Sequence, residues 1–278
     1  MNRCLLKSAI CLSLLLSSHG RAATSYTQDF NSFPDGTTSL GDGTTLYEMD
    51  SGGGVYSGAL RLTVLGRSSS YTSLSIPSLT GAASGWSASF DFSLTSGGLA
   101  PADGFSFAWG AGLFPFSGGE TQFIPPDEGA ERGWSGDVDH LYFGFDTYDN
   151  GENDHGFWLG GSNGTGEEIF ASQRGQLLDL NQTITGSVHI SWHPTEGASF
   201  RTMGFATNIN VSGIPTHSFT AADSNLFGIV ARNGGLTETL FIDNLRIETV
   251  PEPCTGLLGG FAALFVLRRR QRATAVHP

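Results

Sequence analysis

The chain has 278 residues and a strong excess of acidic side chains, with 26 aspartates and glutamates against 14 lysines and arginines. Half of the basic residues lie near the termini, so residues 24–249 carry seven arginines, no lysine and 25 acidic residues, a net charge of −18. Such a surface repels phosphate backbones and anionic lipids, which argues against a nucleic-acid partner and favours divalent cations. The three cysteines are Cys4, Cys11 and Cys254, so no disulfide can stabilise this central region.

The first 23 residues have the three parts of a secretory signal peptide. A basic start with Arg3 and Lys7 precedes a mostly apolar run over 9–16, and small or polar residues follow. The apolar run is far shorter than the roughly 20 residues that a permanent transmembrane helix needs. We therefore expect export of the chain and cleavage by signal peptidase after Ala22 or Ala23.

Residues 24–249 have the composition and pattern of a single all-β domain. Gly, Ser, Thr and Phe are abundant, and Ala88, Phe90 and Phe92 alternate with polar residues, so that one face of a strand is buried. We expect a jelly-roll sandwich of two antiparallel sheets. The expected strands cover residues 59–65, 71–76, 86–94, 104–109, 141–147, 156–159, 184–193, 200–205, 226–231 and 240–247.

The densest group of acidic residues begins at the end of the strand expected over 141–147. Its four carboxylates fall within nine residues and belong to Asp146, Asp149, Glu152 and Asp154. Carboxylates this close repel one another, and calcium, which binds six to eight oxygens, would relieve the repulsion. Oxygens are available from Asp146, Asn150, Asp154 and the carbonyl of Tyr148. The alternative interpretation is a solvated turn rich in Asp and Asn.

Three segments resemble the L-type lectins, the family of the legume lectins and of the mannose lectins of the secretory pathway. They are residues 141–150, the run Ala102-Asp103-Gly104-Phe105-Ser106-Phe107, and residues 227–236, which end in Gly234-Gly235-Leu236. The order of the three segments agrees with the family, and together they span most of the central region. The resemblance implies the concanavalin A-like jelly-roll fold.

The resemblance also implies site residues. The calcium ligands would be Asp146, Tyr148 through its carbonyl, Asn150 and Asp154. The sugar contacts would be Asp103, Asn150 and the backbone around Gly235 and Leu236. Calcium would fix the loop so that Asn150 donates to a sugar hydroxyl, while Asp103 accepts from two hydroxyls. Legume lectins hold a second, transition metal with a Glu where this chain has Gly144, so we expect no second metal.

Catalysis is the less favoured interpretation. A retaining glycosidase needs two carboxylates about 5 Å apart, commonly on one strand. The strand over 141–147 offers only Asp146, and the adjacent Glu167 and Glu168 face opposite sides. His189 and His193 share a strand face, but we interpret them as polar residues of a half-buried strand rather than as metal ligands. We therefore expect no enzymatic activity, with a glycoside hydrolase or polysaccharide lyase as the alternative.

The last 29 residues, 250–278, form a tripartite tail. Pro251-Glu252-Pro253 is followed by an uncharged apolar run over 256–267 and by a basic segment over 268–272 that contains Arg268, Arg269 and Arg270. The tail resembles the PEP-CTERM sorting signal of Gram-negative bacteria, whose members are processed by an exosortase and are often linked to extracellular polysaccharide. The apolar run would lie transiently in the inner membrane, with the arginines on the cytoplasmic side. The resemblance implies a secreted or cell-surface protein.

Three function classes are compatible with the sequence. The first is a calcium-dependent carbohydrate-binding protein whose partner is an extracellular polysaccharide or glycan. The second is a structural protein of the exopolysaccharide matrix that lacks a sugar site, and the third is a polysaccharide-active enzyme. The joint presence of Asp103 and Asn150 favours the first, because a purely structural domain gains nothing from an acceptor and a donor placed in two loops.

Overall fold

The computed structural model describes residues 23–32, 42–49, 51–98, 100–101, 103–111, 139–149, 151, 155–163, 167–205, 208–216 and 219–250. Residues Thr24–Val250 form one compact unit. The predicted signal peptide up to residue 22 and the PEP-CTERM-like tail from Pro251 onward lie outside the described residues, as do Asn150 and Asp154. Across the described ranges, no helix is both long enough and apolar enough to cross a membrane.

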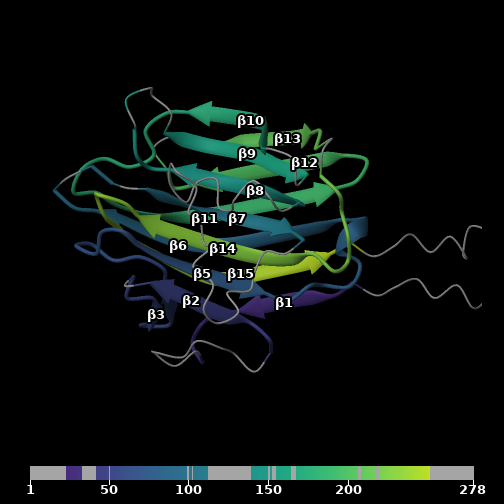
Figure 1. Cartoon of the computed structure of the whole chain (residues 1–278), viewed down its shortest axis with the longest axis horizontal. Coiled ribbons are helices and arrows are strands. Elements are labelled where there is room, and N and C mark those ends of the chain that lie inside the picture. Colours follow the sequence, from purple (N-terminus) through teal and green to yellow (C-terminus); the bar gives the residue numbers. More distant parts are fainter. Residues whose placement is uncertain are drawn as a thin grey trace, which may run out of the picture. The chain divides into compact units, whose positions relative to one another are not determined.

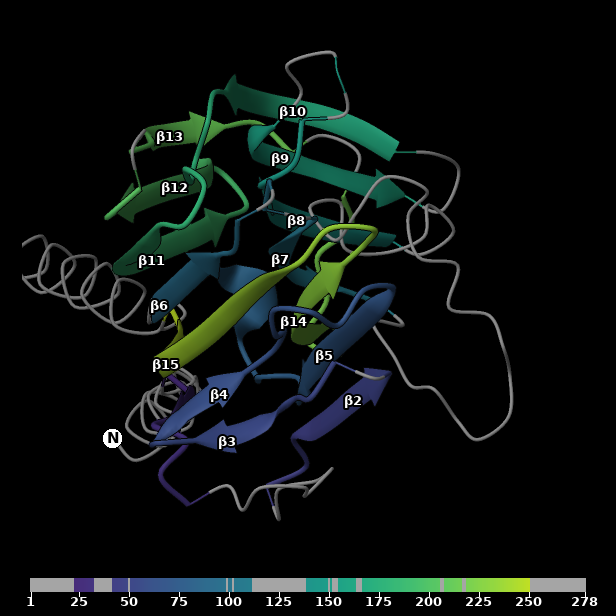
Figure 2. The same cartoon turned by 90° about the vertical axis from the view of Figure 1, so that its left-hand side faces the viewer.

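The described residues form two antiparallel sheets that pack face to face (Figures 1 and 2). The eight-stranded sheet has the order β13-β12-β11-β6-β15-β4-β3, with β1 paired to β15. Its strands are β1 (Ser25–Gln28), β3 (Gly54–Tyr56), β4 (Ala59–Arg61), β6 (Trp86–Ser96), β11 (Thr183–His193), β12 (Gly197–Met203), β13 (Asn210–Ile214) and β15 (Glu238–Thr249). The predicted sandwich of two antiparallel sheets is confirmed.

The seven-stranded sheet has the order β10-β9-β8-β7-β14-β5-β2. Its strands are β2 (Thr45–Met49), β5 (Ser70–Ile76), β7 (Gly104–Gly110), β8 (Asp139–Asp146), β9 (Gly156–Asn163), β10 (Glu167–Arg174) and β14 (Leu226–Asn233). The strands β7 and β8 are direct antiparallel neighbours, as the sequence predicted for residues 104–109 and 141–147. The short 3-10 turn Ala82–Ser84 is the only helical element in the described part of the chain.

The sequence missed five strands, β1, β2, β3, β10 and β13, and four of these lie at the edges of the sheets. An edge strand buries less apolar surface than a central one, so its alternating pattern is weaker. In β13 every residue is exposed or half-buried, and Asn210 and Ser212 lie in it. The predicted strand 59–65 is also too long, because β4 ends at Arg61.

Aromatic side chains fill the space between the sheets. In β6, Trp86, Ala88, Phe90 and Phe92 are buried, while every second residue from Ser87 to Asp91 is exposed or half-buried, which confirms the predicted alternation. From the opposite sheet, Phe105 and Phe145 stack with ring centroids 4.1 Å apart. Such pairs contribute about 0.5–1.5 kcal/mol beyond the burial of their area. The core therefore holds both sheets in a fixed register, and this register positions the strand ends.

The register brings four strand ends together at one end of the seven-stranded sheet. Gly104, the first residue of β7, pairs with Asp146, the last residue of β8, and also with Arg232 near the end of β14. Asn233, the last residue of β14, pairs with Ser70 at the start of β5. Loops that are far apart in the sequence therefore meet at this end, which we call the loop end.

Candidate functional site

Asp103 is fixed at the loop end by backbone bonds to both neighbouring strands. Its amide donates to the carbonyl of Arg232 at 3.0 Å, and its carbonyl accepts from the amide of Thr147 at 3.2 Å. Gly104 follows with a φ of 126°, and a Cβ there would collide with the carbonyl oxygen of Phe145. Only glycine fits this backbone. The Asp103-Gly104 sequence thus places the Asp103 carboxylate at the edge of the sheet.

The Asp103 carboxylate lies against the glycine loop that follows β14. A Cβ added to Gly234 would lie 2.5 Å from Oδ2 of Asp103, so the loop backbone contacts the carboxylate directly. Asp103 Oδ2 also lies 3.5 Å from Nε of Arg232, and its side chain is 18% exposed. Burial raises the pKa of Asp103, although Arg232 opposes this. Asp103 therefore lies beside the loop that contains exposed Gly235 and half-buried Leu236, whereas the predicted convergence of Asp103 with Asn150 lies outside the described residues.

Asn233 holds the glycine loop in place. Its side chain is fully buried. Nδ2 donates to three carbonyls, those of Val64, Arg67 and Glu238, at 3.0–3.2 Å, and Oδ1 accepts from the amide of Glu238 at 3.0 Å. One amide side chain thus satisfies four backbone groups in two segments. Asn233 lies in the segment 227–236 that resembles the L-type lectins, but no role was predicted for it from the sequence.

Glu238 is a buried carboxyl that the sequence analysis missed. Its Oε2 accepts from Oγ1 of Thr147 at 2.7 Å, while its Oε1 is buried without a hydrogen-bond partner. Burial raises the pKa of Glu238 to about 8, the Thr147 bond lowers it, and the nearby Asp103 raises it further. The side chain is therefore neutral at pH 7. The sequence held one indication of this burial. Glu238 lies two residues before Leu240 and four before Ile242, so it shares the buried face of β15 with them.

The acidic loop begins at Asp146, which is 3% exposed. Its Oδ1 accepts from the amide of Tyr148 at 3.0 Å. Asp149 accepts in the same way from the amide of Gly151 at 2.9 Å, and its Oδ2 lies 3.7 Å from Nδ1 of His155. These are the local bonds of Asp-rich turns. Both carboxylates thus help to shape the loop, as the turn interpretation predicted.

The donors of this loop match calcium in kind. A buried carboxylate of Asp146 and a nearby backbone carbonyl of Tyr148 are hard oxygens, which calcium prefers. The other two predicted ligands, Asn150 and Asp154, lie outside the described residues, so the ligand set stays a prediction. Over the ranges that the structure describes, no three His, Cys, Asp or Glu side chains gather closely enough to hold a metal.

His189 and His193 do not form a shared metal site in the structure. His193 lies close to Thr195, with Nδ1 at 2.9 Å from the Thr195 hydroxyl and at 3.3 Å from the Thr195 amide. His189 is exposed on the outer face of β11. Both are polar residues on the half-buried strand, as the sequence analysis interpreted them.

Solved structures with similar folds were found, although the chain matches no family model and no curated protein sequence. Peanut lectin with a nine-residue peptide aligns with a TM-score of 0.58 and 15% identity, over 84% of this chain and 100% of that chain. Basic winged bean lectin with Tn-antigen gives 0.57 and 15%, with the same coverage of 84% and 100%. The exoplasmic domain of VIP36, in a Ca²⁺- and Man3GlcNAc-bound form, gives 0.51 and 16%, over 73% of this chain and 82% of that chain. The chain therefore has the concanavalin A-like fold of these lectins.

Proposed function

We propose that the chain is an exported carbohydrate-binding protein whose lectin-like domain binds a glycan at the loop end in a calcium-dependent manner. The contact between the Asp103 carboxylate and the backbone of Gly234 is the observation that carries the proposal. It places an anionic acceptor beside the exposed Gly235, where a sugar can reach both. Two of the lectins with a similar fold were solved with a sugar or glycan antigen, which adds support.

In this proposal, Asp103 accepts hydrogen bonds from two sugar hydroxyls, and the backbone around Gly235 and Leu236 completes the contact. Such charge-assisted bonds are stronger than neutral ones, and partial burial of the carboxylate strengthens them further. Calcium would be held by Asp146, the Tyr148 carbonyl, Asn150 and Asp154. The ion would supply the positive charge that keeps this acidic loop in one conformation.

The proposal includes export and surface sorting. The signal-peptide pattern of residues 1–23 and the PEP-CTERM-like tail support a secreted or cell-surface location in a Gram-negative bacterium, with signal peptidase and exosortase as processing partners. An extracellular polysaccharide is the partner that this location favours. Replacement of Arg268, Arg269 and Arg270 by Ser should alter processing or retention of the tail, measured by fractionation and mass of the released protein. Unchanged display would contradict the sorting hypothesis.

We also propose that the domain is not an enzyme. Among the described residues of the loop end, Asp103 raises the pKa of Glu238, so these two carboxyls are the pair to consider for acid catalysis. Glu238 is fully buried, so it cannot reach a glycosidic oxygen to protonate it. A pair in which only one carboxyl is accessible supports binding rather than hydrolysis.

A structural matrix protein without a sugar site is the second candidate. The contact between Arg232 and Asp103 favours it, because the guanidinium competes with sugar hydroxyls for the carboxylate. The local turn bonds of Asp146 and Asp149 favour it as well, because they shape the acidic loop without a metal. A glycan array probed with calcium and with chelator separates the two candidates. Binding that requires calcium supports the first, and an array without any calcium-dependent binding supports the second.

Two substitutions separate the sugar contact from the metal contact. Added calcium should stabilise the protein, by about 2.7 kcal/mol at one hundred times the dissociation constant. Asp103→Ala should abolish glycan binding and keep this stabilisation, whereas Asp146→Ala should remove both. Asp91→Ala is the matched control, because Asp91 is an exposed aspartate on the other sheet. Thermal melts and glycan binding measure the two effects, and loss of calcium stabilisation in Asp103→Ala would contradict the assignment.

A further inference from the structure

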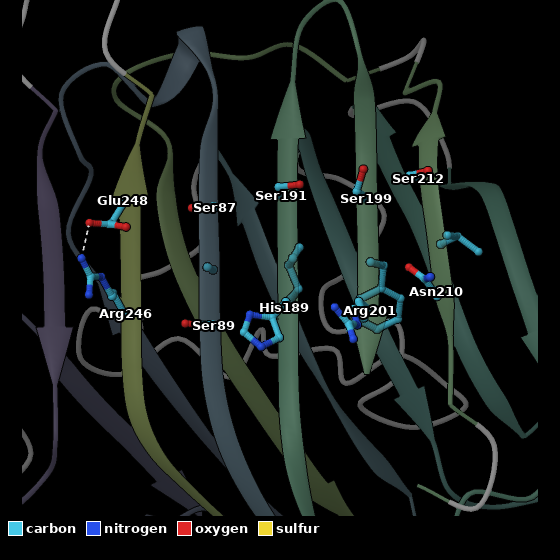
Figure 3. A pocket seen from close by; sticks show the side chains of 14 residues that line it. Ser87, Ser89, His189, Ser191, Ser199, Arg201, Asn210, Ser212, Arg246 and Glu248 are labelled. Carbon is cyan, nitrogen blue, oxygen red and sulfur yellow. Dashed lines mark hydrogen bonds and ion pairs between the residues drawn. The ribbon is translucent and has the colours of Figure 1, made fainter. Parts of the chain in front are cut away.

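A second polar surface lies on the outer face of the eight-stranded sheet. It is an open groove of about 550 Å³ over β6, β11, β12, β13 and β15 (Figure 3). Alternation in these strands turns the apolar side chains toward the core and the polar ones into the groove, as with buried Ile190 between His189 and Ser191. None of the residues that form the loop end lines this groove.

The strand register arranges the polar side chains in two rows across the groove. The first, which we call the donor row, consists of Arg246, Ser89, His189, Arg201 and Asn210, each paired with the next on the adjacent strand. Every member carries a hydrogen-bond donor. Strands lie about 4.8 Å apart, so the row spans about 19 Å. In Figure 3 these side chains lie at one level across the five strands.

The second row lies two residues further along the strands and consists of Glu248, Ser87, Ser191 and Ser199. Three of its four members are serines, whose hydroxyls both donate and accept hydrogen bonds. Short hydroxyl side chains leave room above the sheet, which keeps the groove open. The second row therefore offers neutral hydrogen-bonding groups beside the donor row.

Two basic side chains in the donor row have no carboxylate partner within the described part of the chain. Arg201 is exposed, and among the residues that the structure describes its side chain makes a weak hydrogen bond from Nη2 to Sδ of Met203 at 3.9 Å. His189 is exposed on the neighbouring strand and is the register partner of Arg201. By contrast, Arg246 pairs with Glu248 at 2.5 Å. Two adjacent, unpaired basic side chains stand out in a region whose net charge is −18.

A second groove on the same sheet has a different charge. It lies on the next part of β6, β11, β12 and β15, and its lining contains Asp91 and Asp243 but no Arg, Lys or His. The positive charge of Arg201 therefore distinguishes the first groove from its acidic neighbour. A ligand with a dense negative charge would be repelled by the surroundings, whereas a single anionic group between neutral groups would not.

We propose that this groove binds a polysaccharide that carries carboxylates at intervals along a largely neutral chain. The guanidinium of Arg201 and the imidazole of His189 bind one carboxylate, since a planar guanidinium matches a carboxylate with two hydrogen bonds. Ser87, Ser191 and Ser199 bind hydroxyls of the neighbouring sugars. This site is separate from the loop end, needs no calcium, and would let one molecule hold two glycan segments.

Affinity electrophoresis of the full-length chain tests the proposal, in gels that contain a largely methyl-esterified polygalacturonate, whose few free carboxylates are spaced along a mostly neutral chain. EDTA is present so that no calcium reaches the loop end. We expect retardation by polygalacturonate and none by dextran. Arg201→Gln should weaken the affinity about tenfold or more, because it removes a charged hydrogen-bonding partner. Ser89→Glu should weaken it as well, since it places a carboxylate between Arg246 and His189. Asp103→Ala should have no effect on this affinity.

Arg174→Gln is the matched control, because Arg174 is an exposed arginine on β10 of the other sheet. It makes the same change of charge and should leave the retardation unchanged. Thermal melts confirm that each variant folds. The proposal is overturned if Arg201→Gln behaves like the control, if dextran retards the chain as strongly as polygalacturonate, or if dextran sulfate retards it more strongly. Loss of retardation in Asp103→Ala would move the site to the loop end and equally overturn it.

Discussion

The loop end and the groove on the eight-stranded sheet are both polar, but they are built in opposite ways. At the loop end, Glu238 and Asn233 are fully buried and Asp103 is 18% exposed. Each depends on partners from distant segments of the chain. In the groove, Arg201 and Asn210 are exposed. Each is placed on the outer face by the alternation of its own strand, without partners from distant segments. A buried polar network is costly to break, whereas an exposed row is not. Substitutions should therefore reduce stability at the loop end and only binding in the groove.

The largest expected difference comes from a pair of asparagines. Asn233→Ala removes four hydrogen bonds to the backbone, two of them to the buried amide and carbonyl of Glu238, so the free energy of unfolding should fall by about 3 kcal/mol. Asn210→Ala, on the exposed face of β13, should change it by less than about 0.5 kcal/mol. Urea denaturation of both variants measures the difference. Equal losses would show that the loop end is no more rigid than the groove.

The pH dependence of stability provides the next comparison. Burial raises the pKa of Glu238 to about 8 in the folded protein, from an ordinary value of 4.5 for an exposed glutamate. The folded state keeps a proton that the unfolded chain loses above pH 4.5, so the stabilising effect of this protonation is lost as the pH rises from about 4.5 to 8. Between these two pH values the free energy of unfolding should fall by up to about 1.4 kcal/mol per pH unit. Glu238→Gln should remove this slope, because the amide does not titrate.

Urea denaturation in EDTA at pH 5, 6, 7 and 8 measures the slope for the parent and for Glu238→Gln. Glu248→Gln, which removes an acid from the rim of the groove, should keep the slope of the parent protein. If Glu238→Gln also keeps it, Glu238 is ionised in the folded protein and its burial does not control its charge.

The smallest expected effect concerns the ion pair at the rim of the groove. Glu248→Gln breaks the 2.5 Å contact with Arg246, but both side chains are well exposed, so water and salt screen the pair. No measurable shift of the melting temperature is expected in a scan at physiological ionic strength. A clear loss would mean that the groove contributes to stability and would weaken the contrast with the loop end.

Much of the fold could be predicted from the sequence, because the central strands have strong alternation. Phe90 and Phe92 in β6 and Phe143 and Phe145 in β8 are buried as the pattern requires. The edge strands β2 and β13 were not predicted, since they bury little apolar surface. The lectin-like fold could be inferred from three short motifs in the right order, and similar solved structures confirm it.

The candidate site could be predicted only in part. The motifs around Asp103, Asp146 and Gly235 pointed to loops that the structure places at one end of the sheet, because each follows or precedes a strongly apolar strand. Their role in binding stays a prediction. The roles of Glu238 and Thr147 were not predicted, since a single buried acid and a threonine form no recognisable motif. The donor row was not predicted either, because Arg201 and His189 become neighbours only through strand pairing.

The sequence by itself determined the acidic balance and the alternating strands, since these depend on local composition and on the period of two along a strand. Only the tertiary structure decided which strand ends meet. The pairing of Gly104 with both Asp146 and Arg232 brings three distant loops to one point, and the pairing of His189 with Arg201 places two basic side chains side by side. Register is set by core packing between the sheets, and no single segment contains that information.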